Sequence, residues 1–169
     1  MMGFYEPDWT PPDSSAIDAT TAASDWAKWL APLGAKGTKL GSPSLAKQMD
    51  ETWLTPFSAA SEKPTWDFTC IHANKNSSDL VKSDVEYYYN KYKKPVWVAE
   101  FSCMNDLSWT LCDDPTSFIK ETVAYLEGSE MVVAYGYSNG DGLPESWKIF
   151  DGSGALSDNG KTYLAALNG

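Results

Sequence analysis

Two glutamates of this sequence follow short apolar runs, at positions where a carboxylate could do chemistry. Glu100 lies near the end of the run 94–101, and Glu6 directly follows the run 2–5. Apolar runs bounded by proline and polar loops are typical of buried strands of a parallel sheet, and ligands usually bind at the carboxyl ends of such strands. The two positions therefore suggest a carboxylate pair. In the alternative, each glutamate caps a helix or pairs with a buried lysine or arginine, which would offset a desolvation cost of several kcal/mol.

Strand-like and helix-like patterns alternate along the chain. Strands are predicted at 1–5, 38–43, 66–72, 94–101 and 131–137. Helices are predicted after each of them, with the first capped from 13–15 and the others near 53–57, 78–92, 115–126 and 157–167. Five βα units in alternation predict an α/β fold with a parallel sheet and right-handed crossovers. Because no repeat or linker divides the sequence, residues 1–169 are predicted to form a single domain.

The composition excludes several function classes. The net charge of −10 and the pI of about 4.4 argue against nucleic acid or an anionic membrane as a partner, since both require basic patches. No run approaches the roughly 18 apolar residues that span a bilayer, and no basic and apolar leader precedes Gly3, so we expect neither a membrane span nor a signal peptide. With one histidine, three scattered cysteines and no glycine-rich phosphate loop, the sequence predicts no metal and no cofactor.

Two features favour a secreted or cell-wall protein. Cys103 and Cys112 lie nine positions apart across a polar loop, which is a spacing that allows a disulfide, whereas Cys70 lies in an apolar run and is expected to be buried. Asn76 begins an N-glycosylation motif. Both predict an oxidising compartment.

Four segments taken in order resemble glycoside hydrolase family 128. They read GFYEPD at 3–8, LGSP at 40–43, IH at 71–72 and PVWVAEF at 95–101. The resemblance implies a (β/α)8 TIM barrel that cleaves β-1,3-glucan with retention of configuration, with Glu6 as acid/base and Glu100 as nucleophile. The match begins at the fourth strand of the family's barrel. It therefore implies an incomplete barrel of five C-terminal βα units, which agrees with a length below the typical 200 to 250 residues of a complete one.

The resemblance also suggests which side chains contact the sugar. His72 would orient a carboxylate or a sugar hydroxyl, unless it is a plain core histidine. Tyr5 stands where the family has an asparagine that would bond the sugar 2-hydroxyl, so turnover is expected to suffer more than binding. The remaining expected substrate-binding residues are Asn74, Tyr135, Tyr137 and Trp147.

The sequence leaves two functions open. The first is a retaining endo-β-1,3-glucanase acting on β-glucan oligosaccharide or polysaccharide. If Tyr5 weakens the binding of the transition state, this enzyme would be a weak one. The alternative is a glucan-binding protein derived from the same family that has lost turnover. In either case an open barrel edge would expose unpaired backbone groups, so we expect a homo-oligomer that covers this edge.

Overall fold

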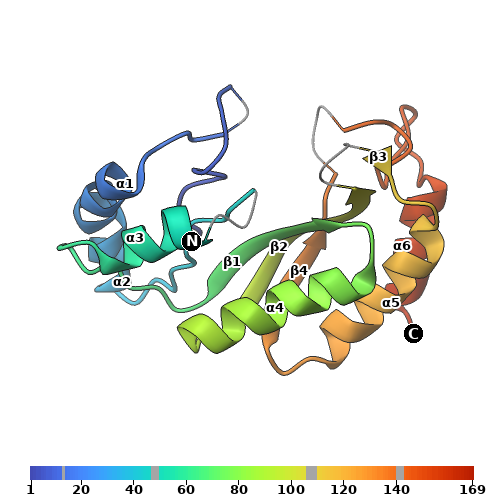
Figure 1. The fold of residues 1–169 in the computed structure, drawn as a ribbon. Coiled ribbons are helices and arrows are strands. Elements are labelled where there is room, and N and C mark those ends of the chain that lie inside the picture. The colour runs from blue at the N-terminus through green and yellow to red at the C-terminus, as the bar shows by residue number, and fades with distance from the viewer. Residues whose placement is uncertain (13, 47–49, 106–109, 140–142) are drawn as a thin grey trace.

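The computed structural model describes residues 1–12, 14–46, 50–105, 110–139 and 143–169 (Figure 1). Its central sheet contains β1 (Thr69–Lys75), β2 (Val96–Asn105) and β4 (Val132–Tyr137), with β2 in the middle and parallel to both neighbours. The short strand β3 (Thr110–Leu111) pairs antiparallel with the end of β2. The expected parallel sheet is therefore confirmed for three strands, and β3 makes the whole sheet mixed.

Two N-terminal segments extend the parallel pairing beyond β1. They are joined by single bridges and not by continuous ladders, namely Met2 with Gly41, Tyr5 with Ser44, Gly41 with Phe68 and Leu45 with Ile71. The spatial order is thus 2–5, 41–45, β1, β2, β4, which is also the chain order. The strands expected at 1–5 and 38–43 are reduced to bridges, in part because Pro43 has no N–H to donate to a ladder.

Helices follow each of these segments. The N-terminal ones are short, namely α1 (Ala19–Asp25), η1 (Trp26–Leu30), α2 (Ala31–Gly34), η2 (Asp50–Leu54) and α3 (Thr55–Ala59). The later ones are longer, namely α4 (Ser78–Tyr92), α5 (Pro115–Gly128) and α6 (Asp158–Leu167), and they cover one side of the sheet (Figure 1). The first helix starts later than expected because the Asp18 carboxylate caps it, accepting from the backbone N–H groups of Thr20 and Thr21.

The hydrophobic core lies between the sheet and the helices. Alternate residues of each strand point into it, as the period of two requires. The strand residues in this core cluster are Ile71, Ala73, Val96, Val98, Phe101, Cys103 and Tyr137. Phe101 packs against Phe118 of α5 and Tyr163 of α6. Within the described ranges, no helix is both long and apolar enough to cross a membrane.

The structure joins Cys103 to Cys112 in a disulfide, with the two Cα atoms 5.4 Å apart. The bond ties the end of β2 to the residue after β3, next to a backbone bond from the Cys112 N–H to the Cys103 carbonyl. Cys70 is buried and unpaired with another cysteine, as expected, and burial raises the pKa of its thiol to about 12.

Candidate functional site

An irregularity in β2 determines the direction of the Glu100 side chain. Ile71 pairs with Val98, but the next residue, His72, pairs with Glu100, so β2 carries one residue more than β1 at this point. The pairing with β4 shows the same excess in β2. Val96 and Val98 face the core, and strict alternation would send Glu100 there too. The extra residue, Ala99, turns Glu100 to the opposite face, which is a known use of β-bulges beside functional sites.

Glu6 lies at the carboxyl end of the first segment in an unusual backbone conformation. Its N–H donates to the Ser44 carbonyl at 2.9 Å, and its own carbonyl accepts from the Trp9 N–H at 3.0 Å. Its φ is +43°, in the left-handed region that non-glycine residues rarely adopt. Such strain costs on the order of 1–3 kcal/mol and is concentrated at functional sites. The turn therefore holds Glu6 in place at the end of the segment.

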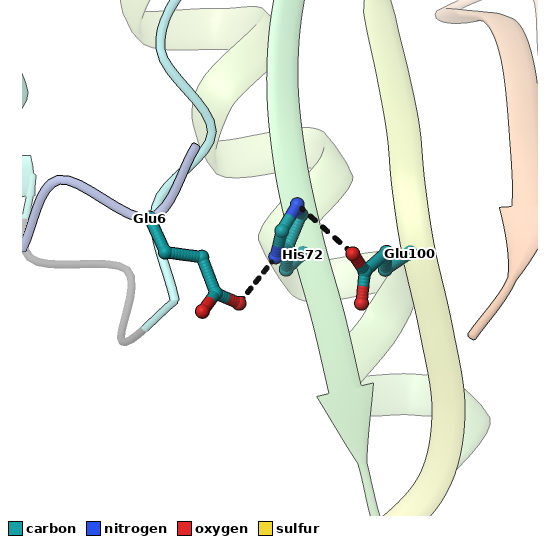
Figure 2. Close-up of side chains that lie close together, drawn as sticks. All are labelled: Glu6, His72 and Glu100. Atoms are coloured by element: carbon teal, nitrogen blue, oxygen red, sulfur yellow. Dashed lines mark hydrogen bonds and ion pairs between the residues drawn. The ribbon is translucent and has the colours of Figure 1, made fainter. Parts of the chain in front are cut away.

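His72 lies between the two glutamates (Figure 2). Its Nδ1 is 2.8 Å from Glu6 Oε1, and its Nε2 is 3.8 Å from Glu100 Oε1. The side chain of His72 is 2% exposed, compared with 15% for Glu6 and 26% for Glu100. An oxygen of Glu6 lies within 4.8 Å of an oxygen of Glu100. The structure thus brings together the two carboxylates and the histidine, and their spacing is close to the roughly 5 Å of retaining glycosidases.

Glu100 has a hydrogen-bond donor on each of its oxygens. The Tyr5 hydroxyl donates to Oε1 at 3.0 Å, and the Ser138 hydroxyl donates to Oε2 at 2.8 Å. The Tyr5 ring also packs at a tilt against the His72 ring, with centroids 5.2 Å apart, and 46% of Tyr5 remains exposed. Tyr5 therefore connects the carboxylate and histidine while offering one surface to a ligand.

The same three side chains are also the group, within the part of the chain that the structure describes, whose nitrogen and oxygen atoms lie close enough to hold a metal ion. Each ring nitrogen of His72 already faces a carboxylate oxygen, with a hydrogen bond at Nδ1 to Glu6 and a longer 3.8 Å contact at Nε2 to Glu100. Carboxylates and imidazole would suit a divalent cation, an option that the sequence did not raise. We assign no metal to this site.

Of the other expected sugar contacts, Asn74 alone shares a strand and a sheet face with His72. It follows His72 by two positions on β1, and its Oδ1 accepts a 2.8 Å hydrogen bond from the Ser102 hydroxyl. Ser102 pairs with Asn74 in the register, just as Glu100 pairs with His72. This polar pair lies next along the same face and can contribute amide donors to a ligand.

The expectation that Tyr135, Tyr137 and Trp147 contact the sugar stays a prediction, and the structure shows where these side chains lie. Tyr135 donates to Glu127 of α5, and Tyr137 packs against Phe101 and Tyr163 in the core. The two tyrosines share the helix-facing side of β4 because they are two positions apart. Trp147 is 2% exposed and has no free ring face for a sugar.

Ser138 is a site residue that the sequence reasoning did not select. It follows Tyr137 at the end of β4 and therefore lies on the opposite side, towards Glu100. The signal that could have identified it is the alternation along β4. If Tyr137 belongs to the core, its neighbour must face the carboxylates.

Comparisons with known proteins show which family and fold this chain resembles. Residues 1–163 match the model of the family described as glycosyl hydrolase catalytic core. An oligosaccharide-binding protein of glycoside hydrolase family 128, subgroup VII, from Trichoderma gamsii is 41% identical, with a TM-score of 0.92 over 99% of this chain and 67% of its own. A subgroup II endo-β-1,3-glucanase from Sorangium cellulosum is 25% identical, with a TM-score of 0.78 over 98% of this chain and 68% of its own.

One curated relative adds a fact about length. Alkali-sensitive linkage protein 1 of Schizosaccharomyces pombe is 29% identical over 98% of this chain, but the chain spans only 32% of that protein. The family model matches nearly the whole chain, and the subgroup VII structure is 41% identical over 99% of it. The chain belongs to glycoside hydrolase family 128, within the glycosyl hydrolase catalytic core family.

Proposed function

We propose that this protein binds β-1,3-glucan oligosaccharides at the face formed by Tyr5, Glu6, His72 and Glu100, and that turnover there is slow or absent. The observation that carries the proposal is the hydrogen bond from the Tyr5 hydroxyl to Glu100 Oε1. The relative from Trichoderma gamsii, at 41% identity, is an oligosaccharide-binding protein, whereas the Sorangium cellulosum glucanase is 25% identical.

The Tyr5 contact bears directly on catalysis. A nucleophilic carboxylate must present an oxygen to the anomeric carbon, but Tyr5 and Ser138 each donate to one oxygen of Glu100. Hydrogen bonds to the charged form stabilise the carboxylate and weaken it as a nucleophile. The family resemblance leads us to expect an asparagine amide here, with a separate donor and acceptor, whereas the single Tyr5 hydroxyl already donates to Glu100, so a sugar 2-hydroxyl loses a partner. Both effects reduce turnover more than affinity.

Binding requires less of the same residues. Carboxylate oxygens accept hydrogen bonds from sugar hydroxyls, and the exposed part of the Tyr5 ring offers an apolar surface to a pyranose face. The net charge of −10 favours a neutral glucan over an anionic ligand. In the same family, an endo-β-1,3-glucanase from Amycolatopsis mediterranei was crystallised with laminaritriose, which supports a β-1,3-linked ligand class.

A second candidate function is retaining hydrolysis at the same site. The observation that favours it is the spacing of Glu6 and Glu100, whose oxygens come within 4.8 Å. Glu6 would then protonate the leaving oxygen and later activate water, while Glu100 would attack the anomeric carbon. A good transition-state contact is worth about 2–4 kcal/mol, so its loss at Tyr5 would slow such an enzyme about 30- to 1000-fold.

The deciding experiment measures binding and cleavage on the same samples. Calorimetry with laminaripentaose should show binding by the unmodified chain, and prolonged incubation should release no reducing ends above the level of Glu100→Gln. Tyr5→Asn should gain turnover and, because its amide supplies a new contact to the sugar in place of the ring, should keep more affinity than Tyr5→Ala. Trp29→Ala, which removes an exposed tryptophan of η1 outside the site, serves as the aromatic control.

Each other result has a clear meaning. Brisk cleavage by the unmodified chain that Glu100→Gln abolishes would establish the second candidate function and reject ours. If neither binding nor cleavage occurs, both candidates fail for this ligand class.

The order of the strands also supports our proposal that the chain forms the last five units of a (β/α)8 barrel. Five parallel segments in chain order are what the last five units of a (β/α)8 barrel would give, and the chain matches 67% of the subgroup VII structure. At one edge, Val133 of β4 is exposed. We expect residues 1–169 alone to self-associate through this edge. Light scattering over a range of concentrations tests this, and a monodisperse monomer would contradict it.

A further inference from the structure

The motif Asn76-Ser77-Ser78 occupies the turn between β1 and α4. It is the one N-x-S/T motif in the 169-residue sequence. β1 ends at Lys75 and α4 begins at Ser78, so the motif bridges a strand end and a helix start. Asn76 is exposed. An exposed asparagine in a surface turn can carry a bulky modification without displacing the core.

A cavity of about 430 Å³ opens beside Asn76. Its lining is polar and acidic, and it includes Ser77, Asp79, Asp113 and Glu121. Carboxylates and hydroxyls accept hydrogen bonds from sugar hydroxyls, whereas the acidic groups of the lining, to which Asp114 also belongs, would repel an anion. The cavity therefore fits a neutral sugar unit better than a phosphate or sulfate.

The disulfide provides an independent observation on the same cavity. Cys112 lines it and is bonded to Cys103. Disulfides form and persist in oxidising compartments, and asparagine glycosylation is a modification of secreted proteins. The bond and the motif thus point to the same route of synthesis, and they meet at one place in the fold.

We propose that Asn76 carries an N-linked glycan whose first sugar contacts this cavity. In the transfer, a bond forms between Asn76 Nδ2 and the anomeric carbon of an oligosaccharide donated by a lipid diphosphate. The bond between that carbon and the diphosphate oxygen breaks, the diphosphate leaves with the electron pair, and Nδ2 loses one proton. The proposal is independent of whether the protein binds or cleaves glucan.

The hydrogen bond of Ser78 indicates that glycosylation must precede folding. Its hydroxyl, which completes the motif, donates to Glu121 of α5 at 2.7 Å in the folded chain. A transferase that must recognise this hydroxyl therefore has to act before α5 packs against α4. Glycosylation is expected during synthesis, and the folded, unmodified protein should be a poor substrate.

The test is to secrete the full chain from a yeast host and analyse it by mass spectrometry. The peptide that contains Asn76 should carry a glycan that endoglycosidase H trims to a single sugar. Occupancy should fall to background in Asn76→Gln and Ser78→Ala and should remain in Ser78→Thr. Ser77→Ala is the matched control, because the middle position of the motif is not read and the Ser77 side chain makes no capping bond.

A second sequon on an added C-terminal tag shows whether the host glycosylates this molecule at all. If the tag is occupied while Asn76 is bare, the proposal is wrong. For the trimmed protein, we expect nuclear Overhauser contacts between the remaining sugar and the Leu111 side chain, which also lines the cavity. If Asn76 carries a glycan but these contacts are absent, the proposal that its first sugar lies in the cavity is wrong.

Discussion

Asp50 and Glu100 are two carboxylates that both accept hydrogen bonds from hydroxyl groups, but they differ in how far they are exposed. Asp50, at the start of η2, is 1% exposed and accepts hydrogen bonds from Tyr87, Tyr92 and Thr55 and an ion pair from Lys91. Glu100 accepts from Tyr5 and Ser138, lies 3.8 Å from a histidine nitrogen, and is 26% exposed. The Asp50 site is saturated by protein donors, whereas the Glu100 site keeps an open side.

The difference teaches how to separate a structural carboxylate from one available to a ligand. Burial alone would raise the pKa of Asp50, but the hydrogen bonds from Lys91, Tyr92 and Tyr87 outweigh it and leave the pKa below its usual value. These donors come from α4, so Asp50 fastens η2 to that helix. A ligand has nothing to gain at Asp50, because its donors are already in place.

The largest expected effect comes from removing the saturated carboxylate. Asp50→Ala leaves the donors of α4 without their acceptor and should lower the free energy of unfolding by about 3–5 kcal/mol, as for other broken buried pairs. Urea unfolding measures this. Glucan affinity at a temperature where the variant is folded should be unchanged.

The matched control is Asp158→Ala. Asp158 lies in the first turn of α6 and pairs with the exposed Lys161, so its loss should cost at most about 1 kcal/mol. Equal destabilisation by the two variants would remove the distinction between the sites.

The second prediction concerns pH. Because the pKa of Asp50 is lower in the folded chain than in the unfolded chain, its contribution is fully present above the unfolded value near 3.9 and is lost as pH falls through the folded value. Stability should therefore decline as the pH falls below the unfolded pKa of this carboxyl. Asp50→Asn should flatten this part of the curve, measured by urea unfolding at several pH values. A parallel decline in both proteins would assign the acid sensitivity to other groups.

At the open site, the largest effect should be on binding. Tyr5→Ala removes the exposed ring and the hydroxyl on Glu100, so affinity for laminaripentaose should fall about 10- to 100-fold, or about 1.4–2.8 kcal/mol. The free energy of unfolding should change by less than about 1 kcal/mol because Tyr5 is exposed. Calorimetry and urea unfolding together check both parts. A large loss of stability with intact affinity would make Tyr5 a structural residue like those around Asp50.

A smaller effect is expected from Ser138→Ala. It removes one neutral donor from Glu100 Oε2, and such a bond is worth about 1 kcal/mol, so affinity should change about fivefold. The direction depends on whether the ligand uses the freed oxygen. An increase in affinity would show that Ser138 competes with the sugar, a decrease would show that it orients Glu100, and no change would exclude both.

The smallest expected effect is that of a chelator. Since His72 faces both glutamates directly, with a hydrogen bond to Glu6 and a 3.8 Å contact with Glu100, EDTA should leave glucan affinity and thermal unfolding unchanged. If EDTA lowered the glucan affinity and one added divalent ion restored it, this prediction would be wrong and the site would be a metal centre.

Much of this arrangement could be predicted from the sequence. The apolar runs located β1, β2 and β4, and the order of strand ends brought Glu6, His72 and Glu100 to one edge. The cysteine spacing indicated the disulfide. These features depend on local patterns, which a single sequence carries.

The remaining features depend on the register between strands, which local sequence patterns do not determine well. Tyr135 and Tyr137 are predicted to contact the sugar as aromatic residues near a strand end; alternation along β4 turns Tyr137 into the core and Tyr135 against it, and brings Ser138 to Glu100. The bridges of the first two segments replace full strands because Pro43 interrupts the ladder. Roles in catalysis or binding for Glu6 and Glu100 stay predictions.

The irregularity in β2 has a consequence for anyone who edits this sequence. Ala99 is the residue of β2 that has no partner in the register with β1, and the alternation resumes after it at Glu100. Deleting Ala99 would leave Glu100 directly after Val98, so ordinary alternation would keep the carboxylate on the site face and Phe101 in the core. A regular ladder that paired Ala99 would instead send Glu100 among the aromatic rings and Phe101 to the other face. The position of the carboxylate therefore depends on a backbone irregularity that substitutions at Glu100 itself would not reveal.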